Sequence, residues 1–392
     1  MNSITDTSIN MLSSKDIETS ILPNSSKVDS RTFSRLLDDE RVVASYKMYW
    51  LLGILEEVSL GNTEMEFNRI IARMIVGAWY PILQYKLSFG IFDNLKKPIN
   101  YVAEKYGLPS NYSEVKLLKL LNENEDKELA MMMKDLTANV PYRLLSPFFS
   151  EELRGKKDSL KENLITNLAL ESDTCLYKII KGDKDRIILN EGWAEYIKEN
   201  YRVIKSWIYY KLVCFLQKRN PNVPAIAFKL EAPKSRNLRE ATLLWKEIIA
   251  VKGIKDIYSG EDFSDESFRR LGVLSIDHFI PWSFVLHDEM WNLVPTFKNV
   301  NSSKNDKLLS YNNYINRFCD VQYKAVSYLS EKGKERSLES YIDVMKIENF
   351  NDYLKYKPKK AFYEKLKGCI SPLYQIAVNQ GFEVVNVIND KI

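Results

Sequence analysis

Apolar residues recur at helical spacing along most of the chain from Thr32 onward. Aromatic and aliphatic side chains from Tyr46 to Ile54 fall on one helix face, and Gly61 is a suitable stop. A second stripe, 67–78, predicts a helix that ends near Pro81, because proline lacks the backbone donor. The same spacing predicts further helices at 98–107, 114–121, 127–136, 159–168, 191–218, 238–251, 264–271, 311–330 and 337–356.

Two stretches break this helical pattern. Short β-rich runs at 176–180 and 186–189 flank a charged turn and predict a hairpin. Between Leu274 and Ile280, apolar and polar residues alternate with the period of a strand. A second strand is expected at 292–295, with a helix that begins around 298–301. The pattern therefore predicts a mainly α protein with a small strand–strand–helix unit and C-terminal helices.

Composition shifts divide the chain into segments. The polar residues 1–30 predict a disordered tail, followed by a helical domain with a small hairpin at 31–219. Residues 220–237 hold three prolines and predict a linker. This linker and its flanks are basic, which is typical of a solvated linker but also of an arm that contacts phosphates. The strand–strand–helix unit is placed in 238–320, with a C-terminal helical segment at 321–392.

Overall composition restricts the class of protein without selecting a function. The 392 residues are 45% hydrophobic and 28% charged, with a net charge of +4, which permits nucleic-acid binding without arguing for it. The four cysteines are widely spaced, which disfavours a disulfide framework or a tetrahedral zinc site and fits a reducing cytoplasm. The apolar runs are shorter than the roughly 20 residues that span a bilayer, so a cytoplasmic protein with no membrane partner is expected.

Both histidines of the chain, His278 and His287, lie close to the predicted strand pair. Asp277 and His278 form a dipeptide, Asn292 follows fourteen residues after His278, and Asn301 follows nine residues later. This arrangement, over roughly 255–310, resembles the HNH (ββα-metal) endonuclease family. Its spacing is most similar to the HNH domain of the RNA-guided CRISPR effector nuclease. The cysteine pairs of a zinc knuckle, present in many HNH proteins, are absent around the motif.

The resemblance implies a role for each residue of the motif. His278 would be the general base for the attacking water, and Asn292 would tie the hairpin loop and so orient it. Asp277 and Asn301 would ligate Mg²⁺ (or Mn²⁺) through oxygen. Asn305, one turn after Asn301, is an alternative ligand. His287 is interpreted as a loop residue.

Three lysines lie on or just after the helix of the motif. Lys298, Lys304 and Lys307 are either solvated or contacts to the nucleic-acid backbone.

Two functions follow from this resemblance. One is a metal-dependent endonuclease that hydrolyses phosphodiester bonds in double-stranded DNA, in bacterial defence or restriction, including antiviral defence. The alternative is a partner-binding or regulatory helical protein with a weak or silent HNH domain, whose protein partner binds the helical N-terminal region. The presence of Asp277, His278 and Asn301 favours the enzyme.

Overall fold

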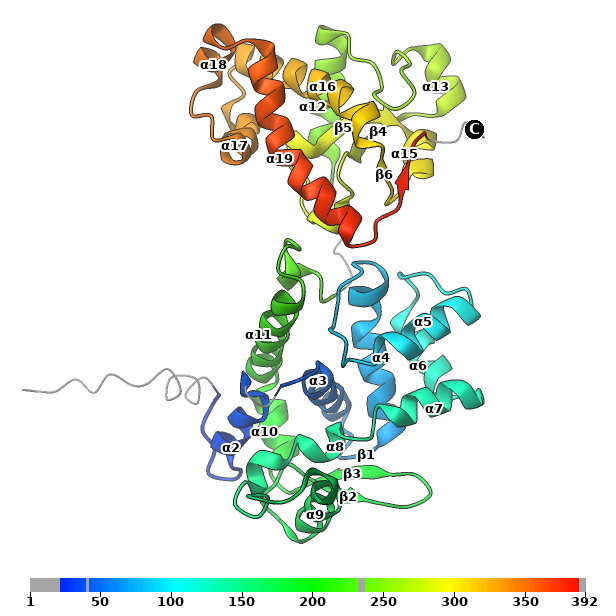
Figure 1. Ribbon diagram of the computed structural model, residues 1–392, viewed down its shortest axis with the longest axis vertical. Coiled ribbons are helices and arrows are strands. Elements are labelled where there is room, and N and C mark those ends of the chain that lie inside the picture. Colours follow the sequence, from blue (N-terminus) through cyan, green and yellow to red (C-terminus); the bar gives the residue numbers. More distant parts are fainter. Residues whose placement is uncertain (1–21, 40–41, 232–236, 388–392) are drawn as a thin grey trace, which may run out of the picture. The chain divides into compact units, whose positions relative to one another are not determined.

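The computed structural model describes residues 22–39, 42–231 and 237–387. They form two compact units, one with the residues up to Pro221 and 229–231, and the other with 222–228 and 237–387. Both are built mainly from helices, which confirms the predicted fold class (Figure 1). No helix in the described part of the chain is long and apolar enough to cross a membrane.

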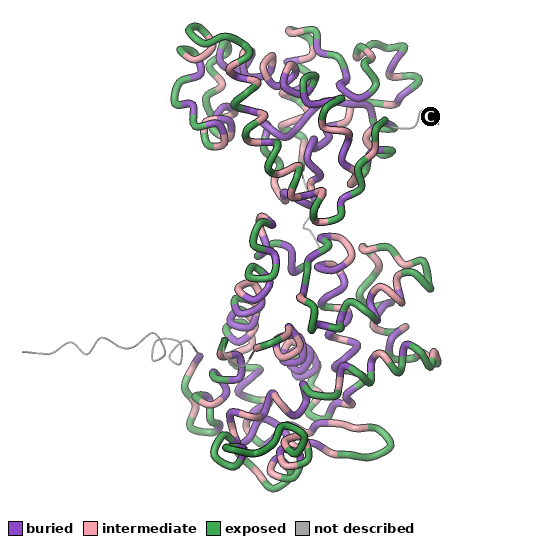
Figure 2. Tube along the Cα trace, viewed as in Figure 1, coloured by how far each residue is buried: buried purple, intermediate pink, exposed green. Residues whose placement is uncertain are grey.

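Helices make up most of the first unit. Helix α3 (Tyr46–Ser59) packs against α4 (Phe67–Leu83) and α11 (Tyr201–Arg219), and their facing sides are buried (Figures 1 and 2). The remaining α-helices are α2 (Ser30–Ser34), α5 (Lys96–Lys105), α6 (Glu114–Asn122), α7 (Lys127–Asp135), α8 (Val140–Arg143), α9 (Asp158–Glu171) and α10 (Trp193–Glu199). The 3-10 helices are Arg35–Leu37 and Ser146–Phe149.

A three-stranded antiparallel sheet accompanies these helices. Strands β2 (Tyr177–Ile180) and β3 (Arg186–Leu189) form the predicted hairpin, which is confirmed. Strand β1 (Glu64–Glu66) pairs with β3 and was not predicted. Its three residues are too few to show a period of two.

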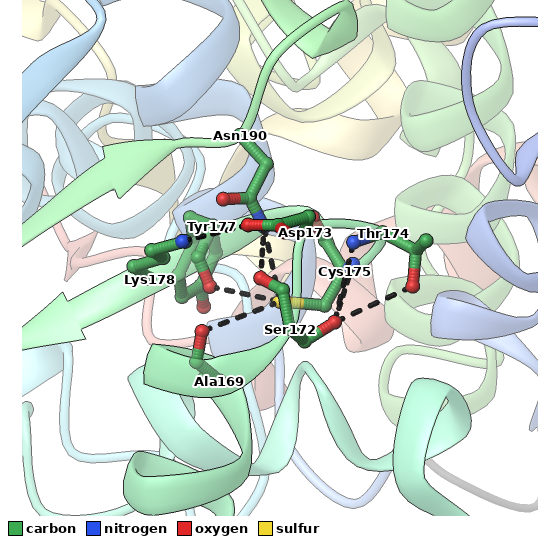
Figure 3. A network of polar contacts seen from close by, with 8 residues as sticks. All are labelled: Ala169, Ser172, Asp173, Thr174, Cys175, Tyr177, Lys178 and Asn190. Atoms are coloured by element: carbon green, nitrogen blue, oxygen red, sulfur yellow. Dashed lines mark hydrogen bonds and ion pairs between the residues drawn. The ribbon is translucent and has the colours of Figure 1, made fainter.

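Figure 3 shows the loop that joins α9 to β2. The Asn190 amide nitrogen donates to the carbonyls of Ser172 at 3.0 Å and Cys175 at 2.8 Å. The Cys175 thiol donates to the carbonyl of Tyr177 at 3.2 Å. Burial raises the pKa of the Cys175 thiol, so this network holds the loop together and does not present a reactive thiolate.

The helix expected over 191–218 is two helices, α10 and α11, separated at Asn200. The Asn200 side chain donates to the carbonyl of Tyr196 at 2.9 Å, a local bond that competes with helix continuation. In α4, by contrast, Pro81 does not end the helix. It lies in the last turn and loses one bond, from its position to the Gly77 carbonyl, and α4 ends two residues later at Leu83, near Pro81 as predicted.

The predicted disordered tail is wrong in its last part. Residues 1–21 lie outside the described residues, but Leu22 and Val28 are buried. The Asp29 carboxylate accepts a hydrogen bond from the Thr32 N–H at 2.9 Å and caps α2. A polar composition did not reveal these few buried apolar residues.

In the second unit, helices surround a small antiparallel strand pair, β4 (Leu274–His278) and β5 (Leu293–Phe297). The helices are α12 (Arg239–Lys252), α13 (Asp265–Leu271), α14 (Trp282–Val285), α15 (Lys298–Lys304), α16 (Tyr311–Glu331), α17 (Glu335–Met345), α18 (Phe350–Tyr356) and α19 (Lys359–Asn379). The 3-10 helices are Ile226–Phe228 and Met290–Asn292. A parallel pair, β6 (Leu308–Leu309) with β7 (Val384–Val385), was not predicted.

A single hydrophobic core unites this second unit. Phe279 stacks on Phe318 with ring centroids 4.2 Å apart, and Phe284 meets Phe382 edge to face at 5.8 Å. Helix α19 was not predicted as a separate helix, because the basic stretch at its start indicated a charged turn. It packs along α16 (Figure 1). The predicted boundary between 320 and 321 therefore falls inside one core.

Candidate functional site

The two strands of the candidate site pair in a register that explains a proline inside a strand. The Phe279 N–H donates to the Asn292 carbonyl at 2.8 Å, which makes this a hydrogen-bonded pair. Because such pairs alternate with non-hydrogen-bonded ones, Ile276 and Pro295 form a non-hydrogen-bonded pair. Pro295 thus removes no ladder bond, and the carbonyls of Ile276 and His278 point away from β5.

Helix α15 supplies hydrogen-bond donors to both of these carbonyls. The Asn301 amide nitrogen lies 3.2 Å from the carbonyl oxygen of Ile276 and 2.8 Å from Ser275 Oγ. One turn later, Lys304 Nζ donates to the carbonyl of His278 at 2.8 Å. A carbonyl can only accept, so the Asn301 nitrogen must face the strand. The Asn301 amide oxygen then remains for another partner.

Asp277 is buried between a phenol and an ammonium group. Its Oδ2 accepts from the Tyr258 hydroxyl at 2.5 Å and lies 3.0 Å from Lys304 Nζ. Among the described residues, no hydrogen bond to Asp277 Oδ1 is found. Burial, and then the Asp277 charge, raise the pKa of Tyr258 well above its ordinary value, so Tyr258 remains a neutral donor.

Lys304 does not lie where its sequence-based interpretation placed it. Its side chain is 1% exposed, and its ammonium contacts Asp277 and the His278 carbonyl. This burial fits neither a solvated lysine nor a contact to a phosphate backbone, and it corrects that expectation. Lys298 is exposed at the start of α15, and Lys307 is 40% exposed with its ammonium 3.7 Å from Glu383.

His278 ends β4 and turns its ring towards the loop that follows. Nε2 lies 2.8 Å from Asp288 Oδ1 and 3.2 Å from the carbonyl oxygen of His287. Both partners are acceptors, so in the neutral ring Nε2 carries the proton and Nδ1 is the acceptor. Sequence reasoning missed Asp288. A carboxylate in the connecting loop was the available signal, but the loop path decides whether it reaches the ring.

The loop between the strands is tied down by Asn292, which is fully buried. Its Oδ1 accepts from the Ile280 N–H at 2.8 Å, and its Nδ2 donates to the Ile280 carbonyl at 2.9 Å. With the backbone bond from Phe279, these contacts close both ends of the loop that carries Asp288. A carboxylate at this position could accept the first bond but could not donate the second.

The strand pair and α15 together form a ββα unit with an Asp-His dipeptide at the end of its first strand. Residues 256–309 match the family model of the HNH endonucleases. The predicted resemblance to the HNH family is confirmed over these residues, whereas the nearer resemblance to the HNH domain of the CRISPR effector stays a prediction. No curated protein and no solved structure matches the chain.

The oxygen atoms of the HNH site fit a hard divalent cation. HNH nucleases generally use such ions, and the described residues contain no group of three or more His, Cys, Asp or Glu side chains that could hold one. Mg²⁺ needs only one or two protein oxygens because it keeps several waters. Asp277 Oδ1 and the Asn301 amide oxygen are donors of that kind. Asn305, the alternative, is the C-cap of α15 with a φ of 47° and is exposed.

Proposed function

We propose that this chain is a metal-dependent endonuclease that hydrolyses phosphodiester bonds in double-stranded DNA through its HNH domain. The observation that carries the proposal is the buried pair of Asp277 and His278, on a ββα unit that matches the HNH family model. Because this unit resembles that family, we propose that the protein acts in bacterial defence or restriction, including antiviral defence.

In the proposed mechanism, His278 is the general base. Its Nδ1 accepts a proton from water, the water oxygen attacks phosphorus, and the bond to the leaving oxygen breaks. Asp288 and the His287 carbonyl hold the Nε2 proton, 2.8 Å and 3.2 Å from that nitrogen, so the basic nitrogen is Nδ1. The Asp288 carboxylate also stabilises the imidazolium that forms.

The remaining residues hold the cation and the substrate. Asp277 and Asn301 would bind Mg²⁺ or Mn²⁺, which neutralises charge that develops on the phosphate and the leaving oxygen. Asn292 keeps the loop closed. Lys298 and Lys307, at the two ends of the α15 region, would contact the DNA backbone.

The first test of this function is cleavage by the full chain. Purified protein is incubated with supercoiled plasmid, linear duplex and RNA, with Mg²⁺, Mn²⁺ or EDTA. We expect DNA cleavage that stops in EDTA, and its loss in Asp277→Ala and Asn301→Ala. Asn299→Ala, an exposed asparagine on the same helix, is the matched control and should cleave normally. If only RNA were cleaved, the substrate would be RNA and not DNA. If nothing were cleaved under any condition, the chain would not be an endonuclease.

A second test uses the fact that the chain has only two histidines. His278→Ala should lower the cleavage rate by about 10²–10⁴-fold, the usual contribution of general-base catalysis, with DNA binding retained. His287→Ala should leave the rate near that of the wild type. The reverse pattern would show that the motif is aligned to the wrong histidine.

A partner-binding or regulatory role with a weak or silent HNH domain remains the second candidate. The observation that favours it is the ion pair between Lys304 and Asp277, 3.0 Å apart, which already neutralises the proposed metal ligand. Calorimetric titration with Mn²⁺, without nucleic acid, separates the two candidates. Binding to the wild type supports the nuclease. Binding only to Lys304→Met would favour a silent domain, and the helical unit would then be the part that binds a protein partner.

A further inference from the structure

A cavity of about 700 Å³ opens in the first unit, among residues that the HNH chemistry does not use. Its walls come from the N-terminal end of α3, from α8, from the 3-10 helix Ser146–Phe149 and from the N-terminal end of α9. Its volume lies within the roughly 300–1,000 Å³ that is typical of small-molecule sites. Half of the lining residues lie in these helices, and the other half, including Phe92 and Arg154, lie in the segments that connect helices.

Basic side chains outnumber acidic ones among the residues that line the cavity, although Arg154 lies 2.7 Å from Glu151 and Lys161 lies 3.4 Å from Asp158. Lys47, Arg143, Arg154 and Lys161 line it, with Asp158 as the one carboxylate among its lining residues. The chain as a whole is nearly balanced, with 56 basic and 52 acidic residues. A local excess of cations in a concave site favours an anionic ligand.

The Arg143 guanidinium is fixed by Asp158, which engages only one of the three guanidinium nitrogens. Its Nη2 donates to the Asp158 carbonyl at 3.0 Å and to the Asp158 carboxylate at 2.7 Å, and its side chain is only 21% exposed. A guanidinium has five N–H donors, and both of these bonds use the same nitrogen. Within the described residues, no hydrogen bond from its Nε or Nη1 is found. Nη2 belongs to both forked edges of the guanidinium and is engaged by Asp158. The remaining Nε and Nη1 donors therefore lie on different edges, and each can give a single charge-assisted bond to an anion.

An apolar part accompanies the charged one. Phe92 and Val43 both line the cavity, and they are 68% and 66% exposed. Tyr46 lies beside them, and burial raises its pKa to about 12, so it stays a neutral ring. Exposed apolar side chains gathered at a cation-lined cavity are a common mark of a ligand site. The ligand would combine negative charge with a flat apolar body.

We propose that this cavity binds a nucleotide, with the phosphates on Arg143, Arg154 and Lys161 and the base against Phe92. Inorganic phosphate would leave the apolar side uncovered, and an uncharged aromatic molecule would leave the cations unused. The first unit is then a nucleotide-binding unit in its own right. This inference does not depend on the nuclease function.

Calorimetry on the full chain tests the proposal, in EDTA so that the HNH site holds no metal. The probes are ATP, tripolyphosphate and adenosine. We expect ATP to bind with one-to-one stoichiometry, at least about tenfold more tightly than either of its two parts, because only ATP uses both sides of the cavity. No binding of ATP would overturn the proposal. Equal binding of tripolyphosphate would also overturn it, because the site would then recognise charge alone.

Matched variants locate the site. Arg154→Ala and Phe92→Ala should each weaken ATP binding about tenfold, as loss of one charge-assisted hydrogen bond or one stacking contact would. Lys156→Ala and Ile91→Ala change exposed neighbours that do not line the cavity and should leave the affinity unchanged. Equal losses in test and control variants would place the ATP elsewhere. A single-stranded oligonucleotide is a further probe. If it bound more tightly than ATP, and if the same variants weakened its binding, the ligand of the cavity would be a nucleic-acid strand and not a free nucleotide.

Discussion

Glu57 in the helical unit and Asp277 in the HNH domain are both buried carboxylates, but their partners differ. Glu57 uses both oxygens: Oε1 lies 2.8 Å from Arg73, while Oε2 lies 2.6 Å from Arg69 and 2.7 Å from Asn62. Asp277 receives both of its partners, Tyr258 and Lys304, on Oδ2 alone. A carboxylate with all its acceptors satisfied serves the fold, whereas one with an oxygen left over is available for chemistry.

One buried lysine from each unit, Lys304 and Lys229, can be compared in the same way. Lys304 has a carboxylate 3.0 Å away. Lys229 lies with its ammonium 5.6 Å from the centre of the Tyr85 ring, and burial lowers the pKa of Lys229 to about 7. In the HNH domain a buried cation is paired with the candidate metal ligand. In the helical unit, burial disfavours the charged form of Lys229.

The same isosteric change at both carboxylates should impair cleavage only at Asp277, and this is the largest expected effect. Asp277→Asn should lower DNA cleavage by about a hundredfold or more, because metal binding to the charged oxygen contributes several kcal/mol. The free energy of unfolding should also fall, by about 3 kcal/mol, because the buried Lys304 ammonium would face a neutral amide, although the amide oxygen can still accept from Tyr258. Cleavage assays and urea denaturation on one preparation measure both. Unchanged cleavage would remove Asp277 from the site.

Glu57→Gln should lower the free energy of unfolding by about 3 kcal/mol, because it leaves two arginines facing a neutral group. This is the low end for a buried pair, since Arg69 is half exposed. The cleavage rate of the folded protein should not change. If this variant were as stable as the wild type but cleaved DNA poorly, Glu57 would serve catalysis and not the fold.

Lys229 makes the stability of the helical unit depend on pH. Its folded pKa, about 7, lies below the ordinary value of 10.5, so between these values the unfolded chain binds more protons. Stability should therefore rise with pH across that window, by about 2 kcal/mol between roughly pH 7.5 and 9. Urea denaturation at each pH measures it. Lys229→Met should remove this rise, and an equal rise in the variant would assign it to other groups.

Asp288 is a second carboxylate of the HNH domain, and its proposed role differs from that of Asp277 because it positions His278. Asp288→Ala should lower the maximal cleavage rate about tenfold with substrate binding unchanged, since the His287 carbonyl still accepts from Nε2. Asp288→Glu should recover part of the loss, while Glu289→Gln, in the same loop, should have no effect. Ring ¹⁵N NMR, simplified by the two histidines, should show the Nε2–H tautomer. The Nδ1–H tautomer in the wild type would contradict the role.

The smallest expected effect concerns Lys298 and Lys307. Replacing both by alanine should flatten the salt dependence of DNA binding by up to about one unit of log–log slope per lost phosphate contact. Fluorescence anisotropy over a range of salt concentrations measures the slope. Lys332→Ala, an exposed lysine at the end of α16, is the control. A slope identical to that of the wild type would show that both lysines are merely solvated.

Much of the fold and of the HNH motif is local in the sequence. The period of the apolar residues predicted most helices and the β2–β3 hairpin. The interval from Asp277 through Asn292 to Asn301 runs from β4 through α14, a 3-10 helix and β5 into α15, and its resemblance to the HNH family placed these residues in one ββα unit. Helix breaks were less predictable, because Asn200 acts through a single side-chain bond and leaves no gap in the apolar stripe.

Contacts between elements were decided by the tertiary structure. A lysine reads as solvated in any sequence, and only the packing of α15 on β4 buries Lys304 against Asp277. The path of the loop, and not the ten-residue interval, brings Asp288 to His278. The cavity likewise assembles from segments more than a hundred residues apart, between Val43 and Lys161. Spacing determines which residues share an element, whereas the side chains that meet across elements depend on how the whole core closes.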